Sequence, residues 1–183
     1  MVPLPELWLP ILLSAVFLFI TANILWMMLP FWHRKDYGRL PDEATVLGAL
    51  AKAPSGQYAV PMMDWKNTTP EQRAAAQAGP MATIIVRNPG TFSFPKTLLL
   101  YFIYLLVVCT FVAYITGVTL GTGEHYLRVF RVAGTAGILA FSFSSIADSI
   151  WYGKPWSVTC KLIIDGVIFG LLIAGTFGWL WPR

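Results

Sequence analysis

The chain has little charge and few of the side chains that enzymes and metal sites use. Of its 183 residues only 12% are charged, and there are 2 histidines and 2 cysteines. A soluble domain carries about 25% charged residues, so a water-facing surface of ordinary composition is excluded. Cys109 and Cys160 lie far apart with no CxxC spacing. That spacing favours neither a zinc motif nor a disulfide.

The common catalytic motifs are missing as well. There is no HExxH, no GxSxG and no glycine-rich phosphate loop with its lysine. His33 and His125 are expected on opposite sides of a membrane, so they cannot share one metal ion. No second ligand or base is predicted near His33. We therefore expect a protein that is not an enzyme and has no catalytic, metal or cofactor residues, although a bound lipid or pigment is compatible with the sequence.

Apolar residues make up 56% of the chain and gather in four long stretches. Their lengths predict membrane-spanning helices at 7–29, 97–120, 129–151 and 162–181. The expected fold is an all-α membrane protein with a small α+β cytoplasmic module. In this division, residues 1–29 form the first span, 30–96 the module, and 97–183 the other three spans.

The charge distribution predicts how the chain lies in the membrane. Eight of the thirteen lysines and arginines fall between residues 34 and 96. By the positive-inside rule, this segment is cytoplasmic and both termini are periplasmic, in a bacterial inner membrane. Seven of the eight tryptophans fall at predicted span ends, as in aromatic belts. The basic residues form no stripe along one element, so no nucleic-acid partner is expected.

The module is expected to contain two short helices and two strands. The helices are predicted at 40–53 and 69–79, the second opened by a capping box from Thr69 to Gln72. The strands are predicted at 56–63 and 82–87. So small a segment makes a marginal core by itself. We expect it to rest on the membrane surface or on a partner.

Small residues recur every four positions in the last span, a spacing that lets another backbone approach closely. A shorter stripe of the same kind is expected in the third span. The pattern indicates that these two spans pack on each other, with a docking surface for a partner subunit or pigment as the alternative. The residues are Gly166, Gly170, Ala174 and Gly178 in the last span, and Ala136, Ala140 and Ser144 in the third.

Asp148 and Asp165 are the acids within the predicted spans. Lys161 lies four residues before Asp165, on the same helix face. This spacing favours a structural ion pair joining Asp148, Lys161 and Asp165. The alternative is a path for protons or ions, because carboxylates inside a membrane are often functional.

Two clusters are expected near the membrane surfaces. The stretch "PFWHRKDYGRLPDE" (30–43) leaves the first span, and another basic group precedes the third span. Both are predicted to contact lipid headgroups or a partner. The residues are Trp32, His33, Arg34 and Lys35 in the first cluster, and Arg128 and Arg131 in the second.

Several phrases of the sequence together resemble one family. They are "FWHRKDYGRLPDE", "GQYAVP", "RVFRVAGTAG", "SIWYGKPWS" and "DGVIFGLLIAGTFGWLWPR". The chain resembles a family of small four-span bacterial inner-membrane proteins with no established activity. The resemblance implies the four-span topology and adds no functional residue.

The expected function is that of an accessory or scaffolding subunit in a larger membrane complex. Energy-transducing hosts, such as photosynthetic reaction-centre–antenna or respiratory complexes, fit this expectation. Other membrane-protein subunits and lipids are the expected partners. One alternative is a small transporter using Asp148 and Asp165. The other is a membrane oxidoreductase or lipid-modifying enzyme using His33, Asp36, Tyr37 and Lys161.

Overall fold

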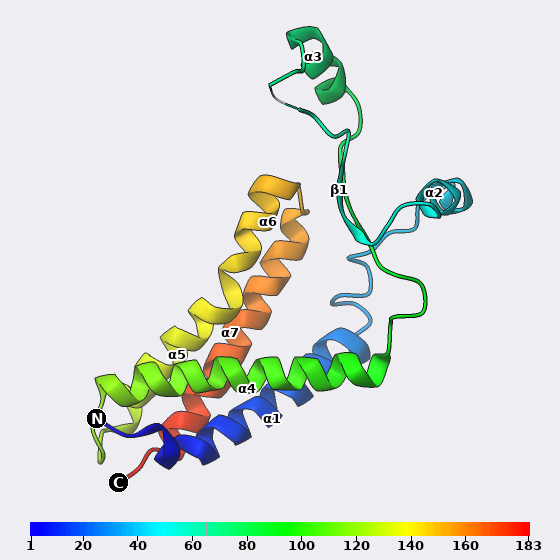
Figure 1. Ribbon diagram of the computed structural model, residues 1–183. Coiled ribbons are helices and arrows are strands. Elements are labelled where there is room, and N and C mark those ends of the chain that lie inside the picture. Colours follow the sequence, from blue (N-terminus) through cyan, green and yellow to red (C-terminus); the bar gives the residue numbers. More distant parts are fainter. Residues whose placement is uncertain (65) are drawn as a thin grey trace. The chain divides into compact units, whose positions relative to one another are not determined.

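The computed structural model describes residues 1–64 and 66–183 and contains four helical spans (Figure 1). Each is long and apolar enough to cross a membrane, so the predicted multi-pass architecture is confirmed. The first span joins a 3₁₀ turn (Leu4–Leu7), α1 (Trp8–Asn23) and a π-helical turn (Ile24–Met28). The others are α4 (Phe94–Thr119), α5 (Tyr126–Ser142) continued by α6 (Ser144–Tyr152), and α7 (Trp156–Trp179).

Helix α7 begins six residues before the predicted start of the last span. Its first residue, Trp156, directly follows Pro155, and Lys161 lies inside the helix. The predicted span began at residue 162 because the charged Lys161 interrupts the apolar stretch on that side. A charged side chain does not interrupt the backbone hydrogen bonds of a helix, whereas a proline does.

The segment between the first two spans contains both predicted helices and both predicted strands. They are α2 (Glu43–Leu50), β1 (Gly56–Val60), α3 (Pro70–Ala78) and β2 (Ala82–Val86). The strands pair antiparallel, with Tyr58 opposite Ile84. The capping box of α3 is present between Thr69 and Gln72. Strand β1 stops at Val60 because Pro61 has no N–H to donate.

The chain divides into two compact units. One comprises Gly38–Ser93, and the other joins Met1–Tyr37 to Phe94–Arg183. The smaller unit is therefore shorter than the predicted module of residues 30–96. Residues 30–37 belong with the helices because His33 and Asp36 bond to α7.

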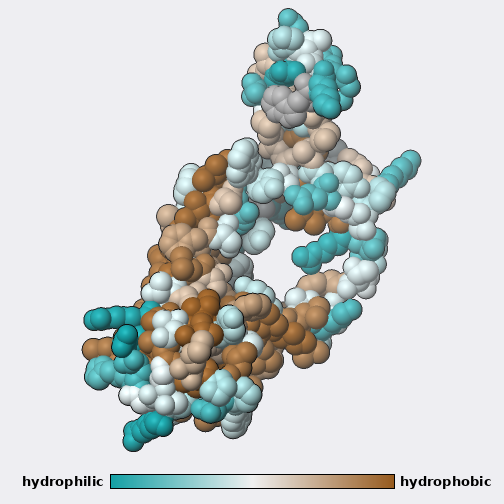
Figure 2. Space-filling model, turned by 60° about the vertical axis from the view of Figure 1, so that its left-hand side comes forward, coloured by the Kyte–Doolittle hydropathy of each residue, from teal (hydrophilic) through white to brown (hydrophobic). Residues whose placement is uncertain are grey.

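In the helical unit, α1 packs on α4 and α7, and α5 packs on the same two helices. The α1–α4 pair crosses the α5–α7 pair (Figure 1). Large side chains fill the space between them, including Leu18, Leu105, Val129 and Phe177. Hydrophobic residues also cover much of the outer surface of the helices (Figure 2). An apolar exterior is what a lipid environment requires.

Helices α5 and α7 approach each other through glycines. A Cβ on Gly170 would lie 2.4 Å from Cγ1 and 2.8 Å from the backbone nitrogen of Ile138. A Cβ on Gly166 would lie 2.2 Å from Oγ of Ser142. At Gly178 the ring of Tyr126 occupies this space, 2.6 Å away. The small residues of α7 thus face the third span directly.

The opposing stripe differs from the one predicted in the third span. Ala140 and Ser144 are exposed, and Ala136 is partly buried against the core. Gly134 and Gly137 face α7 instead. Successive residues of a helix point about 100° apart, because the helix has 3.6 residues per turn. Ala136 and Ala140 therefore point away from the face that contains Gly137.

Both termini lie at one end of the helical unit, beside the connection between α4 and α5 (Figure 1). The backbone N–H of Val2 donates to the carbonyl of Gly117 at 2.8 Å. The Gly123 N–H donates to the carbonyl of Pro182 at 2.9 Å. Nε1 of Trp181 donates to the carbonyl of Gly121 at 2.8 Å. The opposite end holds the turn between α1 and the smaller unit.

We expect Gly170→Ala to destabilise the helical unit by about 1–3 kcal/mol, because the added methyl overpacks the contact with Ile138. Gly175→Ala is the matched control, since a Cβ there meets nothing within 4 Å. Unfolding by SDS in mixed micelles, followed by circular dichroism, measures both variants. Equal stability of the two variants would contradict the close approach of α5 and α7.

Candidate functional site: a buried polar cluster between α7 and residues 29–37

The chain leaves the first span through a compact turn. The π-helical turn ends at Met28, and Pro30 follows shortly after. The Trp32 N–H then donates to the carbonyl of Leu29 at 3.1 Å, and the Asp36 N–H donates to the carbonyl of His33 at 3.0 Å. The second bond brings the side chains of His33 and Asp36 to the same side of the turn.

His33 lies between two carboxylates. Its Nε2 is 2.7 Å from Oδ2 of Asp165 in α7, and its Nδ1 is 2.7 Å from Oδ2 of Asp36. Only 3% of His33 and 3% of Asp165 is exposed. The other oxygen of Asp165 accepts a hydrogen bond from Nε1 of Trp32 at 2.7 Å. Both ring nitrogens and both Asp165 oxygens therefore have partners within the protein.

Lys161 closes the network from α7. Its Nζ donates to the carbonyl oxygen of Trp32 at 2.5 Å and forms an ion pair with Oδ1 of Asp36. Lys161 and Asp165 are four residues apart on α7. Asp165 binds the side chains of Trp32 and His33, and Lys161 binds the carbonyl of Trp32 and the carboxylate of Asp36. Two side chains of one helix thus fix the turn at several points.

The carboxyl of Asp36 lies beyond the membrane span and is almost fully enclosed. Burial acts to raise the pKa of Asp36, but hydrogen bonds and charges from Lys161 and His33 outweigh this effect. The pKa of Asp36 therefore lies below its ordinary value. Asp36 is an anion throughout the neutral range.

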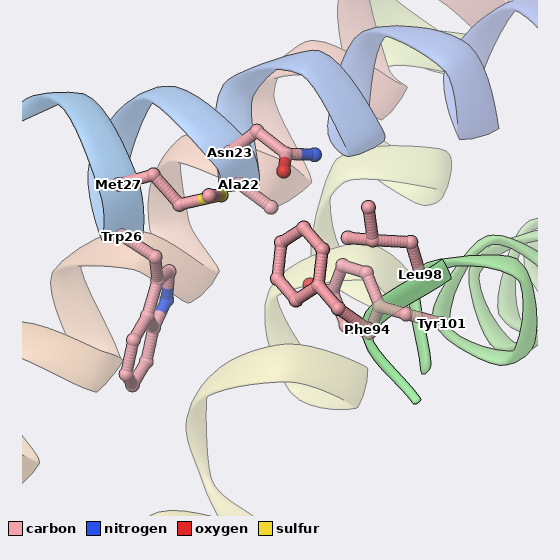
Figure 3. A pocket seen from close by; sticks show the side chains of 7 residues that line it. All are labelled: Ala22, Asn23, Trp26, Met27, Phe94, Leu98 and Tyr101. Atoms are coloured by element: carbon pink, nitrogen blue, oxygen red, sulfur yellow. The ribbon is translucent and has the colours of Figure 1, made fainter. Parts of the chain in front are cut away.

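Trp26 connects the cluster to an apolar pocket. Its ring stacks on that of His33, with centroids 4.0 Å apart and planes at 11°. Trp26 also lines a pocket of 330 Å³ between the end of the first span and the start of α4 (Figure 3). The other lining residues are Ala22, Asn23, Met27, Phe94, Leu98 and Tyr101.

The cluster is electrically balanced when His33 carries a proton. Asp36 and Asp165 then supply two negative charges, and His33 and Lys161 two positive ones. Paired and hydrogen-bonded charges are the form in which a buried site tolerates ions. Among residues 1–64 and 66–183, no three His, Cys, Asp or Glu side chains are arranged to hold a metal ion. The arrangement can hold a proton and position a turn.

The structure corrects the predicted ion pair of Asp148, Lys161 and Asp165. Lys161 pairs with Asp36, and Asp165 contacts His33. Asp148 pairs instead with Lys154, at 2.5 Å, where both side chains are partly exposed. Lys154 follows the tight turn at Gly153 that ends α6, and this turn places its side chain close to the carboxylate of Asp148.

The other predicted surface residues make none of the hydrogen bonds of the cluster described above. Arg34 and Lys35 are exposed, and Tyr37 is 83% exposed. Near the other end, Arg128 pairs with Glu124 at 3.0 Å, and Arg131 is exposed. His125 caps α5 by accepting a hydrogen bond from the Leu127 N–H at 3.3 Å.

The prediction that no second ligand or base lies near His33 is wrong, since two carboxylates contact its ring. The separation of Asp36 from His33 by three residues was a local signal of a contact. Asp165 could not be found in this way, because it is 132 residues further along the chain. Its pairing depends on how α1 packs on α7.

No family model, curated protein or solved structure matches this chain. The resemblance to a family of four-span bacterial membrane proteins therefore stays a prediction.

We expect Asp165→Asn to destabilise the helical unit by about 1–3 kcal/mol, because it weakens the buried hydrogen bonds that Asp165 makes with Trp32 and His33. Asp148→Asn is the control and should cost about 0–1 kcal/mol, since Asp148 and Lys154 are partly exposed. SDS unfolding measures the free energies. Losses of similar size in the two variants would show that the Asp165 contacts contribute no more than a surface pair.

The lowered pKa of Asp36 predicts acid sensitivity. A carboxyl whose pKa falls on folding stabilises the protein above its unfolded-state pKa, about 3.9, and this contribution is lost as the pH drops through the lower folded value. Thermal unfolding from pH 6 down to pH 2 should show this loss. Asp36→Asn should weaken the dependence, whereas Glu6→Gln, an exposed carboxyl, should leave it unchanged. A dependence unaltered by Asp36→Asn would contradict the assignment.

Proposed function

We propose that the protein is a non-catalytic accessory or scaffolding subunit of a larger bacterial membrane complex. In this proposal the four helices sit in the inner membrane with both termini in the periplasm. The smaller unit, Gly38–Ser93, lies in the cytoplasm and binds another subunit. An energy-transducing complex is the host class we favour, and co-purification would identify it.

The main support comes from the lack of a core in the smaller unit. None of its described residues, 38–64 and 66–93, is buried. A two-stranded hairpin is marginally stable in water without a further layer packed on it. Short helices such as α2 and α3 likewise depend on packing for most of their stability. A partner surface would supply the burial that the unit lacks.

The hairpin offers one mainly apolar face for such a partner. Side chains of paired positions share a face and alternate along each strand. Tyr58 therefore lies beside Ile84, and Val60 and Val86 follow on the same face. Val60 is 48% exposed. The opposite face is mixed: it carries Gln57, Ala59, Thr83 and Ile85, of which Ile85 is 71% exposed.

The charge of the smaller unit favours a protein partner over a lipid surface. Between residues 38 and 93 there are five basic and four acidic residues. Binding to anionic lipids usually relies on a cluster of several lysines and arginines without acids between them. A surface of mixed charge is instead suited to complementary contacts with another protein.

The polar cluster supports a structural role rather than catalysis. A general base needs a free position toward its substrate. Both nitrogens of His33 and both oxygens of Asp165 are occupied by internal partners. Tyr37, part of the enzyme alternative, is largely exposed to its surroundings. The cluster is suited to fixing the point where the chain leaves the helices.

The test is purification of the tagged full-length protein from its native membrane in a mild detergent, with quantitative mass spectrometry. We expect at least one other subunit to co-purify in stoichiometric amount. Ile84→Asp should lower its recovery about tenfold or more, because an unpaired buried charge costs more than about 1.4 kcal/mol.

Thr83→Asp is the matched control, since Thr83 is adjacent in β2 but on the opposite face. It should leave recovery close to that of the unaltered protein. A homogeneous monomer without other subunits would contradict the scaffold role. Equal loss in the two variants would contradict the assignment of the apolar face as the binding surface.

A further inference from the structure

The contacts of His33 fix the number of protons in the cluster. Each ring nitrogen is 2.7 Å from a carboxylate oxygen. A hydrogen bond of this length requires a proton between the two atoms. A neutral imidazole supplies only one such proton. The closed arrangement therefore contains one proton more than neutral His33 and two carboxylates would hold.

The surroundings place this proton on the imidazole. Imidazole is a stronger base than a carboxylate. Asp165 already accepts a hydrogen bond from Trp32, and Asp36 accepts one from Lys161, and both bonds favour ionised carboxylates. The stacked ring of Trp26 also favours a cation over its face.

We propose that His33, Asp36 and Asp165 form a proton-binding site whose occupancy holds residues 30–37 against α7. When the proton leaves, the ring keeps one N–H and turns a lone pair toward one carboxylate. The remaining N–H is on Nε2 and donates to Asp165. Apart from His33, Asp165 accepts a hydrogen bond from the neutral side chain of Trp32, so it depends more on this N–H than Asp36 does. Asp36 keeps Lys161, so the contact between His33 and Asp36 opens.

Charges from each neighbouring element act on this site. They come from the turn itself, from α7 and from α4, where Tyr101 is close enough to feel the charge of Asp165. Loss of the proton changes the net charge of the cluster from zero to minus one, and the cluster is nearly closed to solvent. The closed state binds more protons, so falling pH favours it and rising pH opens it. The titratable neighbours are Asp36, Arg34, Tyr37, Lys161, Asp165 and Tyr101.

This proposal does not depend on the partner-binding role of the smaller unit. It concerns the helical unit alone, and its test needs no partner. Failure of the co-purification experiment would leave the proton site unaffected. Failure of the proton test would leave the scaffold role unaffected.

The test is nitrogen-15 NMR of histidine-labelled full-length protein in detergent micelles, titrated from pH 5 to pH 10. His125→Gln serves as the background, because His33 is then the sole histidine. We expect His33 to carry N–H on both nitrogens at neutral pH. At higher pH the Nδ1 proton should be lost and the Nε2 proton kept.

Tryptophan fluorescence reports the charge on the imidazole independently of NMR. A protonated imidazole stacked on Trp26 quenches its emission, so emission should rise in step with loss of the Nδ1 proton. Trp26→Phe should remove most of this rise and leave the part that comes from Trp32, whose ring centroid is 5.9 Å from that of His33. Trp179→Phe, an exposed ring at the other end of α7, should preserve it.

Asp36→Asn provides a second variant that keeps a hydrogen-bond acceptor and removes one negative partner. The loss of the proton should then move to lower pH. Three results would each overturn the proposal. They are a single N–H on His33 at neutral pH, two N–H groups that persist until the protein unfolds, and deprotonation without a change in Trp26 emission.

Discussion

The pairing of His33 with Asp165 joins two parts of the chain that are far apart in sequence. Together with the contacts of Trp32 and Asp36 to α7, it fixes the path of residues 30–37 as they leave the first helix. The bond sets which residues belong to the helical unit and where the smaller unit begins. Lys161 and Trp32 extend the same connection, so the turn is held through the side chains of Trp32, His33 and Asp36 and through the carbonyl of Trp32.

The cluster is compatible with apolar surroundings because its polar atoms have hydrogen-bond partners within the protein. A single buried carboxylate near a span would be costly, and the same carboxylate inside a closed network is not. In this network, four ionisable side chains are enough to hold the turn against α7: His33, Asp36, Lys161 and Asp165. Each of them contacts more than one partner.

Hydropathy predicted the four spans well, because the length of an apolar stretch is a local property. The capping box at Thr69 and Gln72 was equally local and is present as expected. The partners of Asp165 and Lys161 could not be predicted, since they depend on which faces of α1 and α7 meet. The stripe in the third span was misplaced for a related reason. Spacing identifies small residues, and only packing shows whether Gly137 or Ala140 faces the neighbouring helix.

The two ends of the helical unit are fastened by different kinds of bond. Near the termini, backbone groups of Val2, Gly117, Gly123 and Pro182 bond to one another. Such bonds contain no titratable group and survive most side-chain substitutions. The other end relies on four ionisable side chains. Near the termini the ion pair of Arg128 and Glu124 is largely exposed, whereas the ionisable groups of the other end are mostly enclosed, so a change of acidity should act most strongly on the end that holds His33.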